Sequence, residues 1–448
     1  MKVIIVGAGE VGRASAETIS NIHDVLVVEK DENVLNVLKS RLNVSTLKAD
    51  GTNPKTIKYA IENHEADMII ATLGTDSANL FVCLMAKRFK PSIITVSSVN
   101  DPDFMIQTSA DGVPGVDTII SPELITAEKM YKLCVLENAV DFEYMANMGV
   151  AVAMFTVDIH HEIIGKVVMH LPIPPGCTVF AIYRDDVVHT ETETMEIHQG
   201  DRICVFGTDK AISEFNQMMG VEYPARNFAI LGGSIVGRNL ARMLAADKLN
   251  VKIIDKDENK CRDMARTLSG VAIACADFID PEVQNNENIF RTDALISTTH
   301  ADDTNLLMCM NAMRHNSRKV ITRYFTREYE DIFQYTGIET IIGYYRIITN
   351  EITKSTISDE MAMMRSRDPD EFYFVHIVDR QSKLLDRYYG DLNIPDGVRI
   401  VAVKRGTDII YPRLDSRFQD GDSVIVFTSY TRRNDLIRVF GKSSVPEV

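Results

Sequence analysis

The chain has 448 residues, 45% of them hydrophobic and 25% charged, which is ordinary for a globular protein of about three to four domains. Its formal net charge of −15 argues against a general nucleic-acid binder, because a phosphate backbone requires a basic surface. Seven scattered cysteines without a Cys-x-x-Cys pair argue against a disulfide framework or zinc knuckle, and no apolar run approaches the roughly 20 residues that a membrane span needs.

The first residues have the pattern of a nucleotide-binding β-α-β unit. An apolar strand over 3–6 precedes Gly7-Ala8-Gly9-Glu10-Val11-Gly12, a helical segment and a second strand that ends in Glu29. The first glycine permits a tight turn, the second lets backbone approach a pyrophosphate, and the third lets the helix pack on its strand. Glu29, 22 positions after Gly7, stands where a carboxylate accepts a ribose hydroxyl. A glycine turn kept only for packing is the alternative interpretation.

Strands and helices continue to alternate up to about residue 120. Strands are predicted over 25–29, 44–49, 68–72, 93–96 and 118–120. This alternation favours a parallel, doubly wound sheet with right-handed crossovers. Because the chain starts with a strand, no signal peptide is expected.

A linker helix is predicted over 123–147, because proline and an acidic residue stand at its start. Its apolar residues exceed one narrow stripe, which indicates burial against a second subunit or within its own domain. From about residue 150 the pattern changes to short β-like runs, and a helix is predicted over 209–219. This part is predicted to be a small β-rich domain.

The chain then repeats the whole plan. Gly232-Gly233-Ser234-Ile235-Val236-Gly237 follows a second apolar strand, and Asp255 lies 226 positions after Glu29. An Asp-x-x-Asn-Leu sequence recurs at 76–80 and 302–306, and a Gly-Asp pair at 200–201 and 421–422. The brief joint between the copies indicates that the halves are fixed to one another.

The predicted fold class is therefore α/β, with two tandem copies of a Rossmann-like doubly wound parallel sheet domain, each followed by a small β-rich α+β domain. The expected segments are a Rossmann domain over 1–122, a linker helix over 123–147 and a β-rich domain over 148–222, then their counterparts over 226–346, 347–366 and 370–448.

These motifs in this order resemble RCK domains, the regulators of potassium conductance, also called KTN domains. Two such units in one chain resemble the tandem-RCK regulatory subunits of Trk potassium-uptake systems, and the resemblance covers essentially the whole sequence. It implies a cytoplasmic regulator, peripheral on the inner face of the cell membrane, that binds NAD(H) or ATP/ADP. It also implies a homo-oligomer, expected to be a tetrameric gating ring, and a separate membrane potassium channel or transporter subunit of the Trk type.

The resemblance also assigns roles to residues of the first copy. Gly7, Ala8, Gly9, Glu10, Val11 and Gly12 would wrap the phosphates, and Glu29 would hold the adenosine ribose. Asp50 would lie beside the adenine, and Thr72 and Leu73 would close over the nucleotide. Ordinary loop capping is the alternative for Asp50 and Thr72.

The second copy has counterparts in Gly232, Gly233, Ser234, Gly237, Asp255, Asp277 and Thr298. Ser234 replaces the middle glycine, so its side chain is expected to hinder backbone approach and weaken this site. The family often has an Arg-x-Arg pair after the fifth strand, where the first copy has Ser98 and Asn100, and the second has Arg323 and Phe325. Without these arginines the first site favours NAD(H) or a mono- or diphosphate over a triphosphate.

No metal site is expected. His160 and His161 are adjacent, and neighbouring residues on a strand would point to opposite faces. The acidic residues Glu191, Glu193 and Glu196 fit a solvated run, and the Asp302-Asp303 pair fits a helix N-cap.

Three functions are compatible with the pattern: a nucleotide-controlled regulatory module, an NAD-dependent oxidoreductase, or a nucleotide-binding scaffold without a switch. An oxidoreductase needs an acid–base group or metal at the nicotinamide, and the sequence has no Tyr-x-x-x-Lys pair and no Cys/His metal spacing. A scaffold leaves the duplication unexplained. The sequence therefore favours a regulator that catalyses no reaction.

Overall fold

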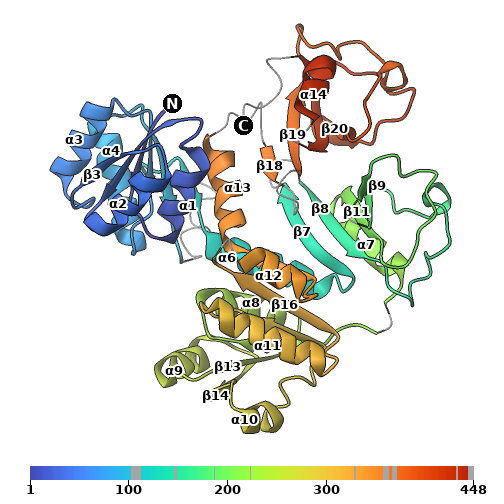
Figure 1. The fold of residues 1–448 in the computed structure, drawn as a ribbon, viewed down its shortest axis with the longest axis horizontal. Coiled ribbons are helices and arrows are strands. Elements are labelled where there is room, and N and C mark those ends of the chain that lie inside the picture. Colours follow the sequence, from blue (N-terminus) through green and yellow to red (C-terminus); the bar gives the residue numbers. More distant parts are fainter. Residues whose placement is uncertain are drawn as a thin grey trace. The chain divides into compact units, whose positions relative to one another are not determined.

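The computed structural model describes residues 1–101, 113–145, 149–185, 187–221, 223–326, 329–356, 363–365, 371–429 and 432–441. These residues form two six-stranded parallel sheets and two five-stranded antiparallel sheets (Figure 1). The chain divides into two compact units, one mainly of residues 1–126 and 344–358, the other mainly of 127–343 and 359–446. Within the described ranges, every helix falls short of the length or apolar character that a membrane span requires.

The first parallel sheet, blue in Figure 1, has the strand order β3-β2-β1-β4-β5-β6, which reverses between β1 and β4. Its strands are β1 (Lys2–Val6), β2 (Asp24–Glu29), β3 (Ser45–Lys48), β4 (Met68–Ala71), β5 (Ile94–Ser98) and β6 (Thr118–Ile120). Its helices are α1 (Glu10–Ile19), α2 (Glu32–Arg41), α3 (Pro54–His64) and α4 (Asp76–Phe89). The central strands are almost wholly apolar and buried, as expected for a parallel sheet with both faces covered.

The second parallel sheet has the equivalent order β14-β13-β12-β15-β16-β17. Its strands are β12 (Asn227–Leu231), β13 (Asn250–Asp255), β14 (Val271–Cys275), β15 (Ala294–Ser297), β16 (Lys319–Tyr324) and β17 (Thr340–Gly343). Its helices are α8 (Ile235–Ala246), α9 (Glu258–Thr267), α10 (Pro281–Asn286), α11 (Asp302–Arg314) and α12 (Glu330–Tyr335). The predicted fold class, with two doubly wound sheets, is confirmed.

The β-rich parts form two antiparallel sheets with equivalent orders, β10-β9-β11-β8-β7 and β18-β19-β22-β20-β21. The first contains β7 (Ala139–Met145), β8 (Val150–Thr156), β9 (Cys177–Arg184), β10 (Val187–His189) and β11 (Arg202–Gly207), with η2 (Val168–His170) and α7 (Asp209–Met219). The second contains β18 (Met363–Arg365), β19 (Glu371–Ile377), β20 (Arg399–Arg405), β21 (Asp408–Ile410) and β22 (Ser423–Ser429), with η5 (Tyr389–Asp391) and α14 (Arg433–Phe440).

The two antiparallel sheets share one hydrophobic core. Phe180 from the first sheet packs edge-to-face on Phe427 and Tyr373 of the second, with ring centroids 5.3 and 5.9 Å apart. The buried Tyr183 hydroxyl also bonds the Glu371 carboxylate. These two β-rich domains therefore belong to one compact body.

The helix predicted over 123–147 is shorter than expected. Helix α6 (Pro122–Val135) ends twelve residues early, and β7 follows it. Val140, Phe142 and Tyr144 alternate with acidic residues, a period of two that favours a strand. The interpretation of this stretch as continuous helix was wrong.

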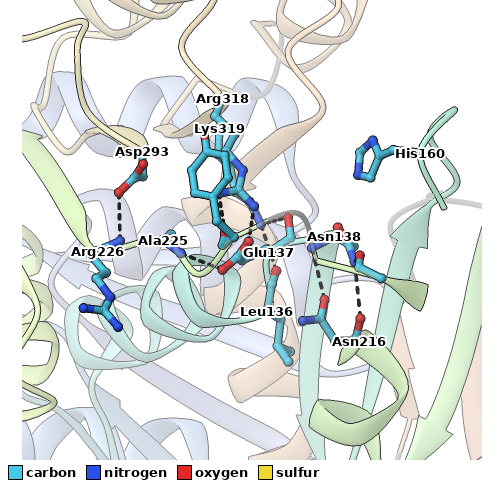
Figure 2. Close-up of polar contacts among 12 residues, drawn as sticks. Leu136, Glu137, Asn138, His160, Asn216, Ala225, Arg226, Asp293, Arg318 and Lys319 are labelled. Carbon is cyan, nitrogen blue, oxygen red and sulfur yellow. Dashed lines mark hydrogen bonds and ion pairs between the residues drawn. The ribbon is translucent and has the colours of Figure 1, made fainter. Parts of the chain in front are cut away.

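Tertiary contacts also close the end of α6. Lys319 Nζ donates to the carbonyl oxygens of Leu136, Glu137 and Ala139, at 2.9, 3.1 and 2.8 Å (Figure 2). These carbonyl groups lie just beyond the last helical turn, where a cation complements the helix dipole. A residue 180 positions away in sequence thus caps the linker helix.

The second linker helix, α13 (Tyr344–Thr356), begins three residues before the predicted 347–366 segment. It packs against α1 within the first compact unit, and the Thr18 and Thr349 hydroxyls lie 3.1 Å apart (Figure 1). The connector of the second copy therefore contacts the first Rossmann domain. Several predicted domain boundaries, at 147–148, 222, 366–370 and 448, lie outside the described residues.

Candidate nucleotide-binding sites

The candidate residues of the first copy gather where the strand order of the first sheet reverses. The glycine turn follows β1, Glu29 ends β2, and Asp50 follows β3. Thr72 and Leu73 follow β4, and Ser98 ends β5. In open α/β sheets ligands bind outside the carboxyl ends of the strands at such a switch point. The topology therefore brings these residues to one edge of the sheet.

The glycine turn needs its first and third glycines for steric reasons. Gly7 has a φ of +99°, and a Cβ added there would lie 2.8 Å from the Thr72 carbonyl oxygen. A Cβ at Gly12 would lie 2.0 Å from the Gly7 carbonyl oxygen, so only glycine lets α1 pack this close to β1. Gly9 differs, because a Cβ there would meet no heavy atom within 4 Å. Its exposed face is the side from which a ligand can approach.

The N-terminus of α1 fits a phosphate group. Gly9 is its N-cap and makes no side-chain capping bond, which leaves the first-turn amides of Glu10, Val11 and Gly12 facing outward from an open turn. Backbone amides at a helix N-terminus bind anions without further side chains. The cradle, the open face at Gly9 and the uncapped helix together meet the requirement of a pyrophosphate.

Glu29 and Thr72 hold this turn from two sides. Glu29 Oε2 accepts the Ala8 amide at 2.8 Å, and its Oε1 accepts the Lys30 amide at 2.8 Å. Thr72 Oγ1 is buried and donates to the Gly7 carbonyl oxygen at 2.9 Å. Both side chains therefore position the glycine turn, in addition to any ligand contact.

The other first-copy candidates have structural partners as well. Asp50 accepts both the Thr52 amide and hydroxyl, at 2.9 and 2.7 Å, and these bonds lower the pKa of its carboxyl group. This geometry is that of loop capping, the alternative raised for Asp50. The Leu73 amide donates to Asn79, and Ser98 is buried with its carbonyl bound by Asn79 Nδ2 at 2.8 Å.

The second copy repeats the frame. Gly232 has a φ of +96°, and Asp255 Oδ2 accepts the Gly233 amide at 2.7 Å. Thr298 Oγ1 donates to the Gly232 carbonyl oxygen at 2.8 Å, as Thr72 does in the first copy. Asp277 accepts the Ile279 amide at 3.1 Å, which caps its own turn.

Three side chains of the second copy lie against its glycine turn. Ser234 Oγ accepts the Gly237 amide at 3.2 Å, so this serine caps α8 and competes for an amide that is free in α1. The Met264 Cε atom would lie 2.6 Å from a Cβ built on Gly233, so this methionine lies directly against the turn. Arg238 Nε donates to the Gly233 carbonyl oxygen at 3.1 Å. The second turn therefore has side-chain contacts from its own domain that the first turn lacks at Gly9.

Arg323 is fully buried at the position where the first copy has Ser98. Its guanidinium donates to the Thr298 carbonyl oxygen at 2.8 Å and lies 4.6 Å from the centroid of the Phe325 ring, on which His300 also stacks. In this conformation the arginine stabilises the loop around Thr298.

The repeated Asp-x-x-Asn-Leu sequence has an organising role that sequence reasoning missed. Asp302 is the first residue of α11, whose N-cap is Ala301, and its two oxygens accept the Phe325 and Thr326 amides at 2.9 Å. The N-cap interpretation of Asp302 was therefore wrong. Asp76 accepts the Asn100 and Asp101 amides in the same way, both at 3.0 Å. The recurrence of this motif was the available signal.

The Gly-Asp pair of each β-rich domain also has a structural partner. Asp201 binds Arg184 through two bonds of 2.8 and 2.7 Å, and Asp422 binds Arg405 at 2.7 and 2.8 Å. Both carboxylates are at most 1% exposed. These pairs fix the turn before β11 and the turn before β22.

We expected His160 and His161 to lie on a strand and to point to opposite faces. In the structure β8 ends at Thr156, and both histidines lie in the loop that follows it. Their ring centroids are 4.5 Å apart, and His161 Nδ1 accepts the Asp158 amide at 2.9 Å. Glu193 pairs with Arg399. Over the described part of the chain, no three acidic, histidine or cysteine side chains converge as metal ligands.

Fold and sites together define the class: a tandem pair of dinucleotide-type Rossmann domains, each followed by a β-rich domain. The TrkA-N domain model matches residues 3–122 and 228–343, more than half of the chain, and the TrkA-C domain model matches 152–220 and 375–444. The chain therefore belongs to the family of proteins with tandem TrkA-N and TrkA-C domains, and the resemblance found in the sequence is confirmed.

Relatives of full length share this organisation. The Trk system potassium uptake protein TrkA homolog 2 of Methanosarcina mazei is 28% identical over 437 residues, which are 95% of this chain and 97% of the relative. The Trk system potassium uptake protein TrkA of Vibrio alginolyticus is 24% identical over 440 residues, 95% of each chain.

Solved structures agree in fold. The GsuK RCK domain superposes with a TM-score of 0.64 at 16% identity, covering 98% of this chain and 94% of that one. The GsuK channel bound to NAD superposes with a TM-score of 0.63 at 15% identity, covering 98% and 78%.

Proposed function

We propose that this chain is a nucleotide-binding regulatory subunit that controls potassium uptake through a separate membrane subunit of the Trk type. It takes NAD(H) or an adenine nucleotide such as ATP or ADP at the first Rossmann site. The chain is located in the cytoplasm, where it binds the inner face of the membrane only through its membrane-embedded partner subunit. Curated relatives named as Trk potassium uptake proteins, and structural neighbours bound to NAD and to ADP, support this assignment.

The observation that carries the proposal is the open glycine turn of the first copy. Gly9 leaves the N-terminus of α1 uncapped and unobstructed, and Glu29 stands at the end of the adjacent strand β2. A carboxylate at that position recognises the ribose of NAD and disfavours a 2′-phosphate. NAD(H) is therefore the preferred ligand over its 2′-phosphorylated form.

An NAD-dependent oxidoreductase is the competing function. It requires a group that exchanges a proton with substrate beside the nicotinamide. In the first copy the candidate polar groups near the turn, Glu29, Asp50 and Thr72, are engaged with backbone amides or carbonyls. Their roles as turn and loop supports favour a binding module that catalyses no reaction.

Self-assembly into a ring is part of the proposal, with four chains giving eight Rossmann domains. Each Rossmann domain exposes apolar side chains at matching positions of one helix. These are Phe81 and Leu84 on α4, 38% and 45% exposed, and Leu307 and Met310 on α11, 58% and 46% exposed. Exposed apolar patches of this kind commonly mark protein interfaces. A Phe81→Glu, Leu84→Glu chain should be smaller in light scattering than wild type and equally folded.

Potassium flux tests the regulatory function. Vesicles that contain the channel subunit should respond to NADH, NAD, ATP or ADP only when this chain is added. Nucleotide control that persists without the chain would contradict the proposal. So would steady NADH oxidation with a small carbonyl substrate that a Gly9→Val substitution abolishes.

A further inference from the structure

The second Rossmann domain holds two cysteine thiols beside its nucleotide turn. Cys261 lies in the second turn of α9 and is 5% exposed, whereas Cys275 ends β14 and is exposed. All other cysteines of the chain, at 83, 134, 177, 204 and 309, are buried. Cys275 is thus the thiol that a solvent-borne oxidant reaches first.

The backbone brings the two thiols together at one carbonyl group. Cys261 Sγ donates to the Asp255 carbonyl oxygen at 3.2 Å. Asp255 is the register partner of Cys275 in the parallel pair of β13 and β14, and the Ala276 amide donates to the same oxygen at 3.1 Å. Burial and the neighbouring Cys275 thiol both raise the pKa of the Cys261 thiol.

The first copy has no such pair. The residues that correspond to Cys261 and Cys275 are Leu35, buried in α2, and Lys48, the register partner of Glu29. Leucine and lysine suffice to complete this part of a Rossmann domain. The two thiols are therefore not a requirement of the fold.

We infer that Cys261 and Cys275 form a reversible disulfide when the chain meets hydrogen peroxide or a related hydroperoxide. The Cys275 thiolate attacks the peroxide oxygen, which yields a sulfenic acid and releases water or an alcohol. Cys261 Sγ then attacks this sulfur while its proton passes to the sulfenic oxygen, so that an S–S bond forms and that oxygen leaves as water. The protein loses two electrons and the peroxide gains them, and a dithiol reductant reverses the step.

The order of the two steps follows from burial. Burial raises the pKa of the Cys261 thiol to about 12, so it stays protonated at neutral pH and does not react first. It acts as the resolving thiol for its exposed neighbour. This order assigns a different role to each cysteine, which separate variants can test.

The disulfide would change the second nucleotide site, a consequence that rests on the proposed function. Asp255 Oδ2 holds the Gly233 amide and its Oδ1 holds the Asp257 amide at 2.9 Å. Met264, one turn after Cys261 on α9, lies against Gly233. A bond from α9 to β14 would fix this helix, with its methionine packed against Gly233, and so restrict the movement of the turn. Oxidation should therefore weaken nucleotide binding at the second site and leave the first site unchanged.

Peptide mapping of the oxidised full chain tests the disulfide without any nucleotide. After peroxide treatment, blocking of free thiols and trypsin digestion, the dipeptide 261–262 should be linked to peptide 267–291, with a loss of two hydrogens. Two thiols per chain should disappear in a thiol assay and return after reduction. The other five cysteines, at 83, 134, 177, 204 and 309, should remain free.

Two variants separate the roles. Cys275→Ser, at an exposed site, should abolish the link and leave Cys261 unoxidised. Cys261→Ser should keep the oxidation at Cys275 but stop at a sulfenic acid that dimedone traps. A wild-type chain in which Cys275 becomes a sulfenic or sulfinic acid while Cys261 stays free would overturn the inference, as would Cys275–Cys275 links between chains. A chain that forms the intramolecular link yet binds no nucleotide would refute the proposed function alone.

Discussion

A single serine introduced at Gly9 should convert the first site toward the capped state of the second. Gly9 has an ordinary φ of −67°, and a Cβ there meets nothing within 4 Å, so the backbone accepts the substitution. In α8 the equivalent Ser234 already caps the helix through the Gly237 amide at 3.2 Å. Gly9→Ser should place a hydroxyl on the Gly12 amide in the same way.

The expected cost to binding follows from one lost hydrogen bond to a charged group. Such a bond contributes about 1.5–3 kcal/mol, and each 1.4 kcal/mol is a factor of ten, so NADH should bind about 10- to 100-fold more weakly. Folding stability should stay the same or rise by a few tenths of a kcal/mol, about 1 °C in melting temperature, because serine is a slightly better N-cap than glycine.

Calorimetric titration with NADH, paired with thermal melting, measures both effects on the same sample. The matched control is Ser234→Gly, which uncaps α8 and should tighten binding at the second site, more so when Met264→Ala also clears the turn. A Gly9→Ser chain that melts like wild type and binds NADH with unchanged affinity would refute the reasoning. It would show that the first-turn amides of α1 do not hold the phosphate.

Three further results are expected. Glu29→Ala should weaken NAD(H) binding by about 1–3 kcal/mol in calorimetry, because it removes the proposed ribose ligand and the acceptor of the Ala8 amide. Asp255→Ala, the matched change in the second copy, should leave binding at the first site intact. Arg184→Met and Arg405→Met should each lower the free energy of unfolding by about 2–3 kcal/mol in denaturant titration. The two losses should be similar, because each substitution leaves a buried carboxylate, Asp201 or Asp422, without its arginine partner. Desolvation lowers the pKa of Lys319 to about 8 in the folded chain, below its ordinary 10.5. Between pH 8 and 10.5 the lysine is therefore protonated in the unfolded chain but neutral in the folded chain, so its contribution makes the free energy of unfolding rise with pH. Lys319→Met should remove this rise in denaturation curves recorded at successive pH values.

The Rossmann frame was predictable because local rules specify it. Buried parallel strands read as apolar runs, and the glycines at 7 and 12 are required by contacts within their own β-α unit. The site residues Glu29 and Asp255 followed from spacing alone. The end of α6 did not, because its cap is Lys319, a residue from a distant strand. Linker bounds depend on such tertiary contacts.

The two glycine turns differ in structure at Ser234, the residue that the sequence singled out, and the expected difference in nucleotide affinity stays a prediction. Ser234 was expected to obstruct a ligand by its bulk, whereas in the structure it bonds the Gly237 amide. Met264 and Arg238 add cover that no motif indicates, since each is an ordinary helix residue until the glycine turn is placed beside it. Sequence patterns locate the backbone of such a site but not the side chains that fold over it.

The position of α1 gives the first site a physical route to the second copy. Its N-terminus faces the phosphate position at Gly9, and one end of the same short helix contacts α13 through Thr18 and Thr349. Helix α13 continues directly from β17, the last strand of the second Rossmann sheet. Helix α1 has ten residues, about three turns, between these two ends. If α1 and α13 move together, as the proposed function requires, a ligand that binds more tightly to one of two placements of α1 also favours the matching placement of α13. The shift is limited by the difference in binding free energy between the two placements.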